Sequence, residues 1–136
     1  SGRVGLMVRT SYFDPEGDLP KHAALGPDWT VQQLVETALT IRSSRGHPAV
    51  ELSRDDGSSL SLGTDGQRAV LVWVNSQGVS QSSVGAGENS LVYDYFGSWT
   101  EAPGDAVVSL PEGLDCLERF VSTGSPATNA VSFRVD

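Results

Sequence analysis

The chain has 136 residues, of which 38% are hydrophobic and 19% are charged, and its formal net charge is −8. This length fits a single domain that buries roughly two-thirds of its unfolded surface. Seventeen acidic and nine basic side chains argue against a nucleic-acid partner, since phosphate contacts need clustered Lys and Arg. The composition favours a basic protein partner instead.

The charge distribution and the cysteine content indicate where a basic partner would bind and in which cellular compartment the protein works. Residues 84–136 hold eight acids and two bases, whereas residues 1–83 hold nine and seven, so the C-terminal part is the more acidic. Cys116 is the only cysteine, which excludes an intrachain disulfide and favours a cytoplasmic protein. No apolar run reaches the ~18 residues of a membrane span. Eight arginines against one lysine suggest a GC-rich bacterial genome.

The N-terminal third is expected to hold one strand and one helix. Val4, Leu6 and Val8 recur at every second position, which predicts a first strand, and residues 14–18 have the composition of a loop. The segment Thr30–Arg42 is predicted to be a helix, because its Thr and Gln form a capping box and its apolar residues share one face.

The middle of the chain is expected to form short antiparallel strands separated by turns. Its turn sequences are Asp55–Gly57, Asp65–Gly66 and Gln77–Gly78. Ala69–Val74 is apolar throughout, as expected of a central strand that is covered on both faces. The other predicted strands are Val50–Leu52, Leu60–Leu62, the polar segment Val79–Val84 and the strongly apolar segment Leu91–Phe96.

A second helix is predicted over Leu110–Ser122. Ser109 is placed to cap it, with Glu112 three residues on, and Gly124 follows where a left-handed C-terminal glycine belongs. Its apolar stripe consists of Leu110, Leu114, Leu117 and Val121, with Phe120 at the border. A last strand is expected over Val131–Val135.

These elements predict a single α+β domain over residues 1–136 with the order β-α-β-β-β-β-β-α-β. The sheet is expected to be mainly antiparallel, a meander, with two helices covering one face and the other face partly open.

The sequence offers no recognisable catalytic or metal-binding set. His22 and His47 lie apart in predicted loops, without a second His or a Cys at metal-ligand spacing. The segment 14–18 resembles a calcium loop only faintly, because leucines stand where its glycine and its bidentate glutamate belong. No G-x-S-x-G nucleophile elbow occurs, and Cys116 is expected to pack beside the second helix's apolar stripe. We therefore expect a protein that is not an enzyme, with no catalytic residues, metal or cofactor.

Four aromatic residues cluster after residue 90 and have two interpretations. Tyr93 and Phe96 are expected to lie mostly in the core, because aromatic side chains dominate cores as well as interfaces. Trp99 is the better candidate for an interface, since Gly97–Ser98 and Thr100–Asp105 have the composition of exposed loops. Tyr95 shares a predicted strand face with Tyr93.

The C-terminal part resembles a known family. The segment Leu91–Gly97, a Pro-Gly loop, the capped helix, Phe120–Pro126 and the closing strand are similar to an immunity-protein family of bacterial polymorphic toxin systems, often paired with deaminase toxins. The likeness covers about residues 30–136, and its most specific piece is the Phe-x-x-Thr-Gly block at Phe120–Gly124. The chain departs from the family in the position of Pro126 and in having Phe133 where a tryptophan is usual.

The resemblance implies an antitoxin that binds one cognate toxin and blocks it by occlusion, without catalytic residues of its own. A deaminase acting on nucleic acids or nucleotides would present a basic or zinc-bearing cleft, which an acidic surface would complement. On this reading Trp99 is the anchor and the surrounding toxin-binding residues are Asp94, Tyr95, Glu101 and Asp105. Neither nucleic acid nor a membrane is expected as a partner, and the oligomeric state is not predicted.

Two other functions fit the same composition. A small-molecule-binding or enzymatic α+β domain could use the open sheet face, and titration with a nucleotide and metabolite panel would reveal it. An acidic nucleic-acid mimic or scaffold would accept many basic partners, whereas an immunity protein is selective for one.

Overall fold

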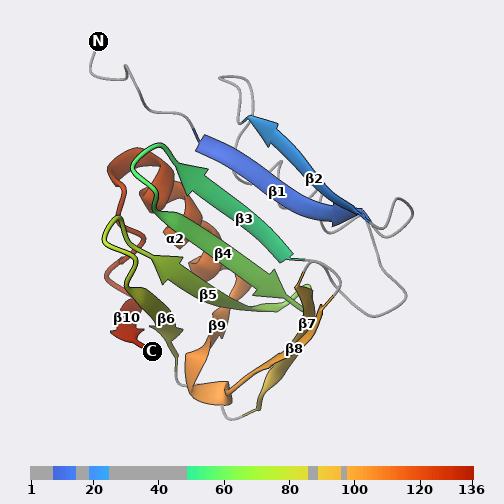
Figure 1. Cartoon of the computed structure of the whole chain (residues 1–136). Coiled ribbons are helices and arrows are strands. Elements are labelled where there is room, and N and C mark those ends of the chain that lie inside the picture. The colour runs from blue at the N-terminus through green and yellow to red at the C-terminus, as the bar shows by residue number, and fades with distance from the viewer. Residues whose placement is uncertain (1–7, 15–18, 25–48, 86–88, 96–97) are drawn as a thin grey trace.

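The computed structural model describes residues 8–14, 19–24, 49–85, 89–95 and 98–136 (Figure 1). They form an eight-stranded sheet, a separate two-stranded sheet, one α-helix and one 3₁₀ turn. Every strand pair is antiparallel. The elements are β1 (Val8–Asp14), β2 (Leu19–Ala24), β3 (Ala49–Arg54), β4 (Ser59–Thr64), β5 (Arg68–Val74), β6 (Ser80–Val84), β7 (Leu91–Tyr95), β8 (Ser98–Ala102), η1 (Gly104–Ala106), β9 (Val107–Ser109), α2 (Leu110–Thr123) and β10 (Ser132–Val135). The predicted α+β class with a mainly antiparallel sheet is confirmed.

The large sheet is a meander that is extended at both ends. Its order is β10-β6-β5-β4-β3-β1-β2, and β9 pairs with β5 beside this path. The three predicted turns join β3 through β6, and each contains a glycine with positive φ: Gly57 at 87°, Gly66 at 98° and Gly78 at 84°. These turns are confirmed, because only glycine adopts this backbone conformation without strain.

Strand β5 lies at the centre, as its uniformly apolar sequence predicted. One edge pairs with β4, while the other pairs with β9 along Arg68–Val70 and with β6 along Val72–Val74. Successive side chains of a strand point to opposite faces, so Leu71 joins one core and Val70 the other.

Helix α2 covers one face of the sheet and begins and ends within one residue of its predicted bounds. Ser109 caps it: the Ser109 hydroxyl accepts the Glu112 amide at 3.3 Å, and the Glu112 side chain accepts the Ser109 amide at 3.3 Å. Gly124 ends it with a φ of 84°. The fully buried residues Cys116, Leu117 and Phe120 pack with Val50, Leu52, Leu60, Leu62 and Leu71. Phe120 is thus central to the stripe, and its predicted place at the border is wrong.

An arginine from the sheet completes the C-terminal end of this helix. The Arg54 guanidinium donates to the carbonyls of Phe120 at 2.7 Å and Val121 at 2.9 Å. The same cation lies 5.6 Å from the centroid of the Phe120 ring. The last carbonyls of a helix lack partners within it. The Phe120 carbonyl also accepts the Gly124 amide at 2.9 Å, so Arg54 adds a second donor there, supplies one to Val121 and offsets the negative end of the helix dipole.

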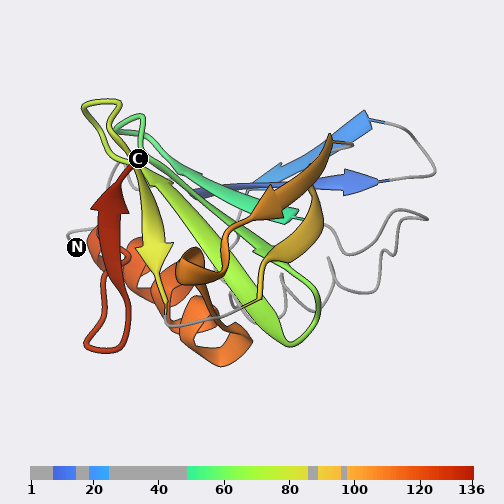
Figure 2. The ribbon, with the colours of Figure 1, turned by 90° about the horizontal axis from the view of Figure 1, so that it is seen from below.

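The opposite face of the sheet is covered by the β7–β8 hairpin. Figure 2 shows α2 on one side of the sheet and the hairpin on the other. The buried residues on the hairpin side are Ala49, Val70, Leu91, Tyr93, Ala102, Ala106 and Val107. A second core therefore lies between the hairpin and β3, β4 and β5, so part of this face is covered. Val72 and Val74, farther along β5 on the same face, are only partly buried, as expected of a partly open face.

Several other elements differ from the prediction. The predicted first strand begins at Val4, which lies outside the described residues, and the described strand β1 covers Val8–Asp14. Strand β2 follows it where no strand was predicted. The predicted loop after Gly97 is instead strand β8, because its Trp and Thr residues favour a pleated strand and pair with β7. The predicted helix Thr30–Arg42 lies outside the described residues.

Candidate functional site

The structure brings most of the predicted site residues into one hairpin. In the β7–β8 register, Asp94 is opposite Trp99, Tyr95 is opposite Ser98, and Val92 is opposite Glu101. Asp105 follows in η1, immediately beyond β8. We give the name hairpin surface to four of the predicted residues: Asp94, Trp99, Glu101 and Asp105. The fifth, Tyr95, lies two rows from Tyr93 in the register and so belongs to the other set of alternate rows.

The base of the hairpin is packed firmly on the sheet. Leu91 is fully buried, Ala102 is 7% exposed and Tyr93 is 6% exposed, and all three contact the core on this face. Burial raises the pKa of the Tyr93 phenol. Tyr93 is therefore a core residue, as expected, while Phe96 lies outside the described residues.

The two ends of the hairpin are tied to the sheet by polar contacts. The Arg68 guanidinium donates to the carbonyls of Asn89 at 3.1 Å and Ser90 at 3.3 Å, just before β7 begins. Beyond β8, the amide of Gly85 donates to the carbonyl of Asp105 at 2.8 Å, and the buried Ser83 hydroxyl donates to the Ala106 carbonyl at 2.6 Å. Both ends of the hairpin are thereby fixed against the large sheet.

The two acids at the base of the hairpin surface differ in their surroundings. Glu101 is exposed on β8. The Asp105 carboxylate is also exposed, but it lies 3.2 Å from the Arg134 guanidinium of β10. Exposed ion pairs contribute little to stability, yet the pair balances the charge of Asp105 locally. Glu101 is therefore the stronger candidate for attracting a basic partner.

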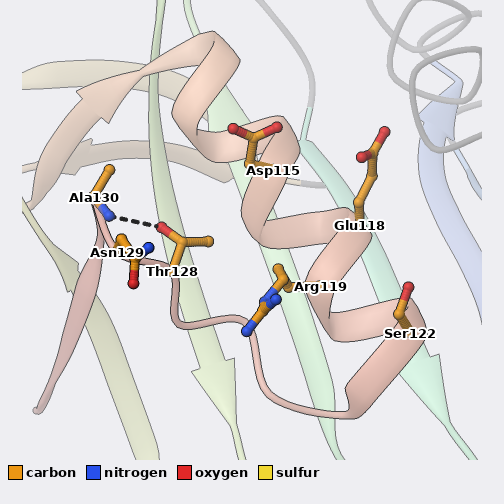
Figure 3. Close-up of a pocket in the computed structure, with 7 residues that line it drawn as sticks. All are labelled: Asp115, Glu118, Arg119, Ser122, Thr128, Asn129 and Ala130. Atoms are coloured by element: carbon orange, nitrogen blue, oxygen red, sulfur yellow. Dashed lines mark hydrogen bonds between the residues drawn. The ribbon is translucent and has the colours of Figure 1, made fainter.

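The acidity of the C-terminal part does not form one continuous surface. Asp115 and Glu118 are exposed on α2, on the far side of the sheet from the hairpin. They line an open groove between α2 and the segment that precedes β10, together with Arg119, Ser122, Thr128, Asn129 and Ala130 (Figure 3). The Thr128 hydroxyl accepts the amides of Ala130 and Val131, which shapes this segment. The sequence alone did not predict that the acidic residues fall on two sides of the sheet, because it gives their order along the chain and not the face on which each one lies.

The described residues contain no metal-binding cluster, and their cysteine is buried. Across these residues, no three His, Cys, Asp or Glu side chains lie close enough together to hold a metal ion. Cys116 is buried in α2, where burial and, to a lesser degree, the Asp115 carboxylate raise the pKa of its thiol to about 11. A thiol that stays protonated at neutral pH is a packing group and a poor nucleophile.

The Cys116 thiol is expected to make the protein less stable at alkaline pH. Its pKa rises from 9.0 to about 11 on folding, so its contribution is fully present below pH 9 and is lost as the pH rises towards 11. Between pH 8 and pH 10, the wild type should lose about 1 kcal/mol more unfolding free energy than Cys116→Ala. Urea unfolding of both proteins at the two pH values measures this difference, and equal losses would refute it.

An α+β domain whose described site is a hairpin bearing aromatic and acidic residues is suited to binding another protein. The chain matches the model of the family "Immunity protein Imm1" over residues 23–129, and it belongs to that family. Its role is accordingly that of an immunity protein, which has a toxin as its partner. No curated protein matches the chain.

Among the described residues, no helix has the length and apolar character needed to cross a membrane.

Proposed function

We propose that this immunity protein binds one cognate toxin through the hairpin surface and occludes the toxin's active cleft. The finer proposal is that the toxin is a deaminase acting on nucleic acids or nucleotides. The observation that carries the proposal is that Asp94 and Trp99 form one row of a two-stranded hairpin, two rows from the exposed Glu101 and above a buried base.

The hairpin has the properties that a protein-binding anchor needs. Its base is buried through Leu91, Tyr93 and Ala102, so the backbone that presents the other residues is held in place before binding. Preorganisation of this kind reduces the entropy lost on association. Alternate rows of a strand pair share a face, so we expect the Asp94–Trp99 row to lie on the same side as the exposed Glu101. A tryptophan on a hairpin that also carries acidic residues suits a basic cleft.

The direct test uses the purified protein and the toxin domain encoded beside it. We expect a 1:1 complex in which the toxin no longer deaminates its substrate, and no complex with a toxin from an unrelated system. A nucleotide and metabolite panel should give no binding. Equal binding to unrelated basic proteins would instead support the acidic mimic, and saturable binding of a metabolite would support the small-molecule site.

Charge reversal on the hairpin is expected to slow association. Glu101→Lys should reduce the association rate up to about tenfold at low salt and flatten its dependence on salt, because exposed charges steer the encounter. Asp105→Lys should have a smaller effect, since Arg134 already balances that charge. The measurement is binding kinetics with the cognate toxin at two salt concentrations.

Glu118→Lys is the matched control for this experiment. It reverses an exposed glutamate on α2, on the other side of the sheet, and therefore changes the net charge equally. We expect Glu118→Lys to leave the association rate close to that of the wild type. A reduction as large as that of Glu101→Lys would show that net charge matters and that the hairpin has no special role.

A further inference from the structure

The Tyr93 ring of the hairpin lies directly against Gly63, near the C-terminal end of β4. A Cβ atom added to Gly63 would overlap the Cγ, Cδ2 and Cε2 atoms of the ring. The register places Gly63 between Ala49 of β3 and Val70 of β5, and both are buried in the core under the hairpin. The sheet therefore presents a hollow, floored by a glycine, into which one aromatic ring fits.

The placement of the hairpin depends on this contact. Among the described strands, β7 and β8 pair only with each other and with no strand of the large sheet. Backbone ladders therefore do not set the height or tilt of the hairpin above the sheet. The Arg68 contacts and η1 fix the two ends of the hairpin. Side-chain packing between the hairpin and the sheet must therefore set its height and tilt.

We propose that Gly63 is a positioning residue for toxin binding, because its missing side chain lets Tyr93 seat the hairpin at the height that the toxin recognises. This inference rests on the proposed function of the hairpin surface. Gly63 itself lies beneath the buried Tyr93 ring, so it acts on the toxin through the hairpin.

Replacing Gly63 by alanine is expected to displace the hairpin in the free protein, since the Tyr93 ring must move to relieve the overlap. Only the fraction of molecules with the hairpin in its original place then binds the toxin, and this lowers the apparent affinity by that fraction. The usual cost of overpacking corresponds to a toxin affinity about 5- to 150-fold weaker. The loss should appear mainly as slower association.

A double-mutant cycle with Tyr93→Leu provides the test. The proteins are the wild type, Gly63→Ala, Tyr93→Leu and the double variant, each measured for association and dissociation with the toxin. We expect Gly63→Ala to weaken binding strongly when Tyr93 is present and by less than about threefold when Leu replaces it, since contacting residues couple. Equal losses in both backgrounds, or no loss in either, would overturn the proposal.

Gly113→Ala serves as the matched control. The added Cβ would lie 3.0 Å from the Ala69 Cβ and 3.1 Å from the Leu62 Cδ1, so it crowds the core on the helix side. It should lower stability but leave toxin association unchanged. A loss of association equal to that of Gly63→Ala would show that general destabilisation is the cause and would overturn the proposal.

Two further comparisons keep the result interpretable. If Gly63→Ala fails to fold, the double variant is compared with Tyr93→Leu, where equal affinities support the proposal and a tenfold loss overturns it. Trp99→Ala tests the hairpin surface separately. Unchanged binding by Trp99→Ala refutes the proposed surface, whereas weakened binding by Trp99→Ala with unchanged binding by Gly63→Ala refutes the positioning role alone.

Discussion

Replacing Leu117 by alanine is expected to lower the free energy of unfolding by about 2–5 kcal/mol. Leu117 is fully buried where α2 meets the sheet, and it packs in the same cluster as Leu62, Leu71 and Phe120. The substitution removes apolar contacts and leaves a cavity between helix and sheet that the strands cannot close. Urea unfolding monitored by circular dichroism measures the loss.

Leu114→Ala is the control for this substitution, because Leu114 is the same residue type on the same helix but only partly buried. Its cost should be clearly smaller than that of Leu117→Ala. Toxin binding by either folded variant should equal that of the wild type, since α2 lies on the opposite side of the sheet from the hairpin. A cost below about 1 kcal/mol for Leu117→Ala would mean that the helix does not pack as described.

Replacing Trp99 by alanine is expected to weaken toxin binding by about 2 kcal/mol or more, which is roughly a 30-fold loss of affinity. An aromatic anchor acts after the encounter, so most of the loss should appear as faster dissociation. Trp99→Ala should therefore change mainly the dissociation rate, whereas Gly63→Ala and Glu101→Lys should both lower the association rate. Kinetic binding to the cognate toxin measures all three.

Trp73→Ala is the corresponding control. Trp73 is partly buried on the helix side of the sheet, where its ring meets Phe133 edge-on with centroids 5.9 Å apart. Its loss should lower stability and leave the dissociation rate unchanged. If Trp99→Ala leaves both rates unchanged while substitutions in residues 50–84 abolish binding, the binding surface lies on the sheet and not on the hairpin.

The features that were predicted correctly are those set by neighbouring residues. The start of α2 follows from Ser109 and Glu112, which satisfy each other's backbone amides within one turn. Its end follows from Gly124, and the turns of the meander follow from Gly57, Gly66 and Gly78. Each of these signals acts over two to four residues, so no tertiary context is needed to recognise it.

The features that were missed depend on contacts between distant residues. The polar composition around Trp99 predicts an exposed loop, but Trp99 and Thr100 favour a strand, and the segment forms β8. Gly63 and Tyr93 are in contact although they are thirty positions apart in the sequence. Such a contact produces no pattern among neighbouring residues from which it could be predicted. The candidate site residues were named from composition and family likeness, and their shared hairpin became visible only in the structure.

Strands β7 and β8 share no backbone hydrogen-bond ladder with the large sheet, so their sequence can change without shifting the register of any other strand. Toxin specificity could therefore diversify by changes in the hairpin alone, while the rest of the fold stays the same. Grafting a hairpin from a relative with another toxin should transfer recognition, provided that the graft keeps an aromatic residue over Gly63 and small residues such as Ala102 at its base.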